Sequence, residues 1–162
     1  MMVCNFHWDT GVSVITIVCL AIILGSMAFV WTVRFQYGFV RYLIIIGLCL
    51  PIIVGLLIMP LKLKLKDDRV EVTRMIGVID IPLSGIEQCG VVGHEVLNNS
   101  VRVFGSGGVF GYLGIFKNNM LGKYTMYATE IDRLIFIKTS QKTYVFSCVD
   151  PTGFIDKIRM LK

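Results

Sequence analysis

Residues 61–75 read LKLKLKDDRVEVTRM. Leucine and lysine alternate strictly in the first half of this stretch, which is the period-two pattern of a strand with one buried face. Asp67 and Asp68 then provide a turn signal, and alternation resumes in RVEVTR. The stretch predicts a β-hairpin, and it marks the point where a continuously apolar region gives way to a sheet-forming one.

The region before this hairpin, residues 1–60, contains only three charged residues, Asp9, Arg34 and Arg41. Residues 11–33 and 42–61 carry no charge, and each run is long enough to cross a hydrocarbon core of about 30 Å as a helix. The short connection between them makes the helices antiparallel neighbours. Residues 1–60 are therefore predicted to form a transmembrane helical hairpin.

Small residues are the expected contacts between two helices in lipid, because they let the backbones approach closely. Ala21 and Gly25 on the first run, and Gly47 and Gly55 flanking Pro51 on the second, are predicted to form this seam. Pro51 removes a backbone hydrogen bond and is expected to kink its helix for packing rather than for transport.

The distribution of basic residues predicts the orientation of the hairpin. Five basic residues follow the second run, whereas the connection holds Arg34 and Arg41 and the N-terminal side holds none. The rule that positive flanks stay inside then places the C-terminal region and the N-terminus in the cytoplasm. The five cysteines, two of them in the apolar runs, predict no disulfide framework and no metal site. They are Cys4, Cys19, Cys49, Cys89 and Cys148.

The region after residue 60 reads as a series of short strands separated by turn residues. Further strands are predicted in VIDI, IEQCGVV, SVRVF, VFGYLGIF, KYTMYAT, LIFIKT and KTYVFSC. Asp150 and Pro151 then form a helix start, and apolar residues recur at helical spacing over 150–161. The prediction is an α+β protein in which residues 61–162 form an antiparallel β-roll or barrel capped by a C-terminal helix.

Four segments carry a resemblance to a known family: RVFGSGGVFGYLGIF from Arg102, LGKYTMYAT from Leu121, KTYVFS from Lys142 and DPTGF from Asp150. Together they resemble the bacterial pleckstrin-homology-like (PH-like) domain family. The resemblance implies a PH-like fold after one or more membrane spans, a bacterial cytoplasmic membrane location and a non-catalytic role. It implies no established ligand.

The glycine-rich segment FGSGGVFGYLG could suggest a phosphate-binding loop, but it lacks both the Lys-Ser/Thr of a P-loop and a following helix. Glycines within strands more often mark bulges or close backbone approach. We therefore expect structural roles, and no bound nucleotide, for Gly105, Gly107, Gly108, Gly111 and Gly114.

The sequence shows no arrangement of residues that is typical of a catalytic or metal site. His7 and His94 have no cysteine, histidine or carboxylate partner at a ligand or triad spacing. We expect no enzyme activity, no metal and no cofactor. The charges after residue 60 are of mixed sign, which does not favour nucleic acid.

Lys62, Lys64 and Lys66 share one face of the first predicted strand, and Arg69 follows at the turn. They form either a solvated face that discourages strand aggregation or a surface that attracts anionic lipid. Asp67 and Asp68 would repel a phosphate there.

The leading functional interpretation is a membrane-anchored binding or assembly module that contacts another membrane protein or a second copy of itself at exposed strand edges or in residues 104–116. Anionic-lipid sensing through the lysine face is the alternative, and an accessory subunit of a membrane enzyme or transporter is the third.

Overall fold

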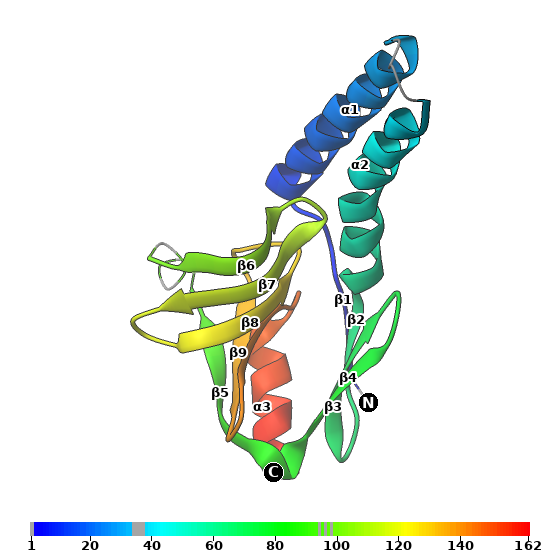
Figure 1. Ribbon diagram of the computed structural model, residues 1–162. Helices are drawn as coiled ribbons and strands as arrows, with labels where there is room; N and C mark the ends of the chain where they lie inside the picture. The colour runs from blue at the N-terminus through cyan, green and yellow to red at the C-terminus, as the bar shows by residue number, and fades with distance from the viewer. Residues whose placement is uncertain (1, 34–37, 94, 96, 98) are drawn as a thin grey trace.

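The computed structural model describes residues 2–33, 38–93, 95, 97 and 99–162. Two long helices extend from one end of a sheet-rich domain, and a third helix closes the chain (Figure 1). In chain order the elements are β1 (Met2–Asn5), α1 (Thr10–Thr32), α2 (Gly38–Ile58), β2 (Pro60–Leu65), β3 (Arg69–Arg74), β4 (Val78–Pro82), a 3₁₀ turn (Leu83–Gly85), β5 (Ile86–Val92), β6 (Val101–Gly108), β7 (Gly111–Asn118), β8 (Gly122–Ala128), β9 (Leu134–Thr139), β10 (Thr143–Ser147) and α3 (Pro151–Leu161).

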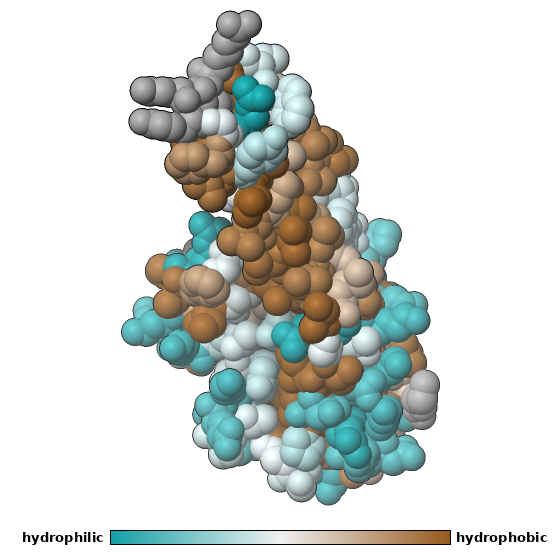
Figure 2. All heavy atoms as spheres, turned by 45° about the vertical axis from the view of Figure 1, so that its right-hand side comes forward, coloured by the Kyte–Doolittle hydropathy of each residue, from teal (hydrophilic) through white to brown (hydrophobic). Residues whose placement is uncertain are grey.

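Helices α1 and α2 confirm the predicted apolar pair, and both are long and apolar enough to be candidate membrane spans. Helix α1 buries only Val12 and Thr16, and α2 buries no residue. A core helix of a soluble protein would instead be covered by the protein around it. Figure 2 shows the apolar surface of the two helices continuing onto the nearest part of the domain, with hydrophilic surface farther away.

The ends of the two helices differ from the predicted 11–33 and 42–61. The side chain of Asp9 caps α1, since its Oδ1 accepts a hydrogen bond from Val12 N at 2.6 Å. Helix α2 starts earlier and includes Arg41, whose guanidinium donates to Val33 O at 2.8 Å and lies over the Trp31 ring. It ends at Ile58 because Pro60 already belongs to β2.

The structure confirms the predicted α+β fold, but the strands form two open sheets rather than a closed barrel. One sheet has the order β1-β2-β3-β4 and the other the order β5-β9-β10-β8-β7-β6. Pairing is antiparallel throughout the described strands except between β8 and β10, which are parallel. The parallel pair arises because β9 and β10 form a hairpin in which β10, the strand that runs in the same direction as β8, lies next to β8.

Helix α3 lies between the two sheets and holds them together (Figure 1). Asp150 caps it through a hydrogen bond from Gly153 N at 3.0 Å, as the Asp-Pro pair predicts. One core contains leucines and valines of β2 and β3, residues of β9 and β10, and the buried face of α3, namely Phe154, Ile155 and Ile158. A second core lies against β8 and β10 and includes Tyr124, Met126 and Val145.

Strand β1 has no counterpart in the predicted elements, because four residues give too little pattern to identify a strand. It pairs with β2, so the N-terminal segment and the domain lie at the same end of the helices. It also brings Cys4 to Cys148, which form a disulfide with a Cα–Cα distance of 5.6 Å. This corrects the expectation that no cysteines pair, since their separation of 144 residues gives no sequence signal.

Candidate functional site

The tip of the β6–β7 hairpin packs directly against the two helices. Thr16 on α1 donates from Oγ1 to Gly108 O at 3.5 Å, and its Oγ1 accepts from Phe110 N at 2.9 Å. The Phe110 ring fills the space above Gly55 of α2, where an added Cβ would lie 2.7 Å from a ring carbon. Thr16 lies about 9 Å along the axis from the start of α1, so the tip reaches beside the apolar helices.

An apolar groove lies between this hairpin and the helices and has a volume of about 460 Å³. Helix α1 contributes Cys19, Leu20 and Ile23, and α2 contributes residues from Pro51 to Ile58. Strand β6 and the turn after it form the remaining wall, which includes Phe104 and Arg102. Arg102 is the one charged residue among the described residues that line the groove.

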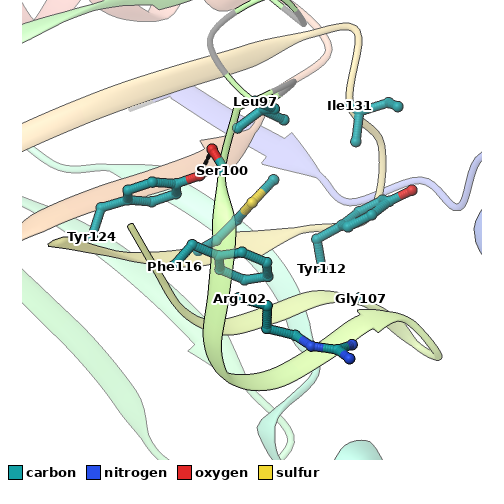
Figure 3. A pocket seen from close by; sticks show the side chains of 9 residues that line it. Leu97, Ser100, Arg102, Gly107, Tyr112, Phe116, Tyr124 and Ile131 are labelled. Atoms are coloured by element: carbon teal, nitrogen blue, oxygen red, sulfur yellow. Dashed lines mark hydrogen bonds between the residues drawn. The ribbon is translucent and has the colours of Figure 1, made fainter. Parts of the chain in front are cut away.

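A second cavity of about 380 Å³ lies against the sheet at β6, β7 and β8 (Figure 3). Tyr112, Phe116 and Tyr124 provide aromatic walls, and Phe116 stacks on Tyr124 with ring centroids 5.9 Å apart. The hydroxyl of Tyr124 donates to Ser100 Oγ at 2.8 Å. Burial raises the pKa of Tyr124, so this hydroxyl stays protonated at neutral pH.

Arg102 lines both cavities. Its side chain extends toward Gly107 near the hairpin tip (Figure 3). Nη1 lies 2.8 Å from the position that a Cβ on Gly107 would take. Within the described part of the chain, the guanidinium forms no salt bridge or side-chain hydrogen bond. Its charge is therefore available to a ligand.

Strand β6 is also an edge strand, paired only with β7. Its apolar side chains are largely uncovered: Val101, Val103 and Phe104 are 69%, 57% and 75% exposed. The free backbone groups of such an edge can pair with another chain. This places an exposed apolar strand next to the groove.

The glycines that were predicted to have structural roles allow positive φ angles and close approach of the two strands in this hairpin. Gly105 and Gly114 lie opposite each other with φ of 119° and 132°, and a Cβ on either would lie 2.0 or 2.2 Å from a carbonyl oxygen of the facing strand. Gly108 and Gly111 flank the turn with φ of 135° and 123°. Gly107 instead provides space for Arg102.

The lysine face has the predicted geometry, but most of its charge is paired within the protein. Leu63 and Leu65 enter the core, and the lysines lie on the opposite face. Lys66 donates to Glu71 Oε2, and Lys64 Nζ lies 3.7 Å from Glu71 Oε1. The hydrogen bond from Lys66 lowers the pKa of Glu71, which stays ionised.

Arg69 is likewise paired, with Asp68, through bonds of 2.8 to 3.2 Å. The side-chain hydrogen bond from Arg69 lowers the pKa of Asp68. Lys62 forms no ion pair with the described residues. The structure thus leaves one of the four predicted basic groups with an uncommitted charge.

The predicted helix seam is not close-packed at most of its small residues. A Cβ on Gly25 or Gly47 would meet nothing within 4 Å, and Ala21 is exposed. Gly55 is in close contact with Phe110 of the hairpin. Pro51 lines the groove, and α2 continues as one helix through it. A seam between α1 and α2 at these small residues therefore stays a prediction.

Among the other residues that the sequence singled out, Cys19 lines the groove. His7 is exposed, while His94, Arg34 and the rest of 34–37 lie outside the described residues. No cluster of three or more potential metal ligands occurs among the residues that the structure describes. Cys19, Cys49 and Cys89 are free thiols.

The sequence does not single out Thr16 or Arg102, and it indicates Phe110 only as part of the predicted contact range 104–116. Phe110, flanked by Val109 and Gly111, has the only positive φ among described non-glycine residues, at 59°. Its contact with α2 spans more than fifty residues of sequence, and nothing in the local pattern indicates it. The concentration of glycines at 105–114 was the available signal that the backbone approaches another element closely.

The domain after the two apolar helices consists of two open sheets joined by a C-terminal helix, with a glycine-rich hairpin that packs on the helices. In the comparison with protein families, residues 61–161 match the bacterial PH domain. The chain belongs to this family, whose members are in general non-catalytic binding modules. The search of curated proteins and the search of solved structures each found no match.

Proposed function

We propose that this protein is a non-catalytic binding module that α1 and α2 anchor in a membrane. The anchoring is supported by two apolar helices that the domain leaves uncovered, since their exposed side chains require an apolar solvent. The contacts of Thr16 and Phe110 support a domain held in one position against the anchor. The module would therefore present a defined surface close to the bilayer.

The observation that carries the proposal is the exposed apolar edge of β6. An edge strand with Val101, Val103 and Phe104 uncovered is suited to pair with an extended segment of another protein. The proposed partner is a neighbouring membrane protein, including a second copy of this chain. Confinement to one membrane raises the effective concentration of both partners, so a small surface suffices.

The proposed location of the domain is the cytoplasmic side of a bacterial inner membrane. The support is the excess of basic residues after α2, from Lys62 to Arg74, over those at the other end of the helices. These charges act on orientation while the chain is inserted, before Lys64 and Lys66 pair with Glu71 in the folded domain.

Photo-crosslinking in intact cells tests the binding surface. A benzophenone side chain placed at position 103 should give a crosslinked species of higher mass. The matched control is position 120, because Met120 is 76% exposed but lies in the turn between β7 and β8. Equal crosslinking at both positions, or none at 103, would refute β6 as the contact surface.

A further inference from the structure

We propose that the groove between α1, α2 and β6 is a binding site for one anionic phospholipid of the bilayer, with an acyl chain between the helices and the phosphate on Arg102. This inference rests on the membrane anchoring proposed above, and it is independent of the protein partner proposed for β6. It assigns a lipid site away from the lysine face of β2.

The charge of the groove fits an amphiphile with an anionic head. Arg102 is the single charged group among its described lining residues, and no described carboxylate pairs with it. Gly107 has no side chain that would block the guanidinium, which lies directly over it. A guanidinium can donate two parallel hydrogen bonds to a phosphate, so Arg102 can bind a headgroup specifically.

The rest of the groove fits an acyl chain. Its helix side consists of apolar side chains, including Leu20, Ile23 and Ile52, and Phe104 covers it from β6. A volume of about 460 Å³ lies within the range of small-molecule sites, about 300–1,000 Å³. An acyl chain there gains dispersion contacts with both the helices and the hairpin.

The position of the groove along the helices selects a bilayer lipid as the occupant. Ile58 is the last residue of α2, so the lower end of the groove lies where the proposed span meets the domain. Ile23 lies about 20 Å along α1 from its start, so the upper end lies well within the hydrocarbon. Arg102 enters from the domain side, where the phosphates of the adjacent leaflet would lie.

Native mass spectrometry of the full-length protein tests the site. The protein is reconstituted in bilayers of equal amounts of phosphatidylglycerol and phosphatidylcholine and is then released in a mild detergent. We expect one phospholipid per chain, mostly phosphatidylglycerol. Arg102→Gln should lower this occupancy about fivefold, the effect of losing one basic contact to an anionic headgroup.

Two pairs of variants separate this site from general surface attraction. Val54→Phe fills the groove and should also remove the lipid, whereas Ile53→Phe should not, because Ile53 is similarly exposed on α2 (50% against 47%) but does not line the groove. Lys62→Gln removes an unpaired charge outside the groove and should leave the occupancy unchanged.

Retention of the lipid in both Arg102→Gln and Val54→Phe would overturn the proposal. Equal losses in Lys62→Gln and Arg102→Gln would also overturn it, since they indicate nonspecific attraction to the bilayer surface. Either result would leave the crosslinking test of β6 unaffected. Conversely, failure of that crosslinking would leave a lipid occupancy that depends on Arg102 intact.

Discussion

Strands β2 and β6 both lie close to the apolar helices and both carry basic residues, but they differ in what their charges do. Lys64 of β2 and Lys66, which directly follows this strand, form ion pairs with Glu71 within the protein. On β6, Arg102 has no such partner among the described residues and lies along the groove. The number of basic residues in a strand therefore does not measure how much unpaired charge the strand presents to a ligand.

The two strands also run differently relative to the helices. Strand β2 continues directly from α2 and leads away from it (Figure 1), so Lys66 lies about 20 Å from Pro60 along the strand. The β6–β7 hairpin instead turns back to the helices at Gly108 and Phe110. If the helices span a bilayer, β6 therefore remains near its surface, whereas most of the lysine face does not.

The largest expected effect comes from separating β6 from the helices. Phe110→Ala removes a buried ring that packs on Gly55 and lies 6.2 Å from the ring of Trp8. Loss of a buried phenylalanine costs about 3–5 kcal/mol. Thermal unfolding of the full-length protein in detergent should show a clearly lowered Tm. Hydrogen exchange should become faster in the β6–β7 hairpin and remain slow in β2 and β3.

Phe104→Ala is the matched control, because it removes the same side chain from the same hairpin at a position that is 75% exposed. It should change stability by no more than about 0.5 kcal/mol. Similar losses in both variants would mean that the hairpin tip does not pack on the helices.

A smaller effect should appear on the β2 side when the disulfide is removed. Cys4 lies on β1, which pairs with β2, and Cys148 follows β10. Replacing both with serine should lower stability by about 2–4 kcal/mol under oxidising conditions. The measurement is the Tm with and without reductant, and Cys89→Ser is the control because Cys89 is a free thiol. An equal Tm of the wild-type protein with and without reductant would contradict this expectation.

The same pair of cysteines reports the orientation in cells. Thiols in the cytoplasm are kept reduced. The proposed cytoplasmic location therefore predicts that the Cys4–Cys148 disulfide of the structure is reduced in intact cells, so that both thiols react with a reagent that traps the redox state. If the pair is trapped as a disulfide, the domain lies on the oxidising side of the membrane.

The smallest expected effect comes from releasing the lysines of β2. Glu71→Gln should change stability by no more than about 1 kcal/mol, the usual range for surface ion pairs. It should increase binding to vesicles that contain phosphatidylglycerol, because Lys64 and Lys66 lose an internal partner. Co-sedimentation with such vesicles measures the change, and Glu87→Gln, which alters a carboxylate without a salt bridge among the described pairs, is the control.

Acid should have the same effect as this substitution. Lys66 holds the pKa of Glu71 below its ordinary value of 4.5, so the folded protein binds the Glu71 proton less readily than the unfolded chain. The stabilisation is present above that value and is lost as pH falls through the lowered pKa. Vesicle binding of the wild-type protein should rise in that range, whereas Glu71→Gln should lack this component.

Elements with a strong local pattern could be predicted from the sequence. The uncharged runs gave the two helices, the leucine–lysine alternation gave β2, and Asp150 with Pro151 gave the start of α3. Strand β1 was missed because its four residues lack a repeating pattern. The closure of the sheets was also predicted incorrectly, because strand patterns do not specify that β10 lies parallel to β8.

The candidate site depends on contacts between distant segments, which explains why it was not predicted. The pairing of Cys4 with Cys148 and the contact of Thr16 with Phe110 each require the folded chain. The sequence also could not predict that Arg102 lacks an ion-pair partner among the described residues, since a sequence does not show which carboxylates lie near a guanidinium. The lysine face could be predicted because its lysines alternate with leucines in one short segment, residues 61–66.

The most direct test measures whether β6 or the β7–β8 turn lies closer to the bilayer. In a variant with Trp8 and Trp31 replaced by phenylalanine, a tryptophan at position 104 is compared with one at position 120, two sites that are 75% and 76% exposed. The protein is reconstituted in bilayers that contain a fluorescence-quenching lipid. Quenching should be strong at position 104 and weak at position 120. Equal quenching at the two positions, or none at 104, would contradict a β6–β7 hairpin held at the membrane surface.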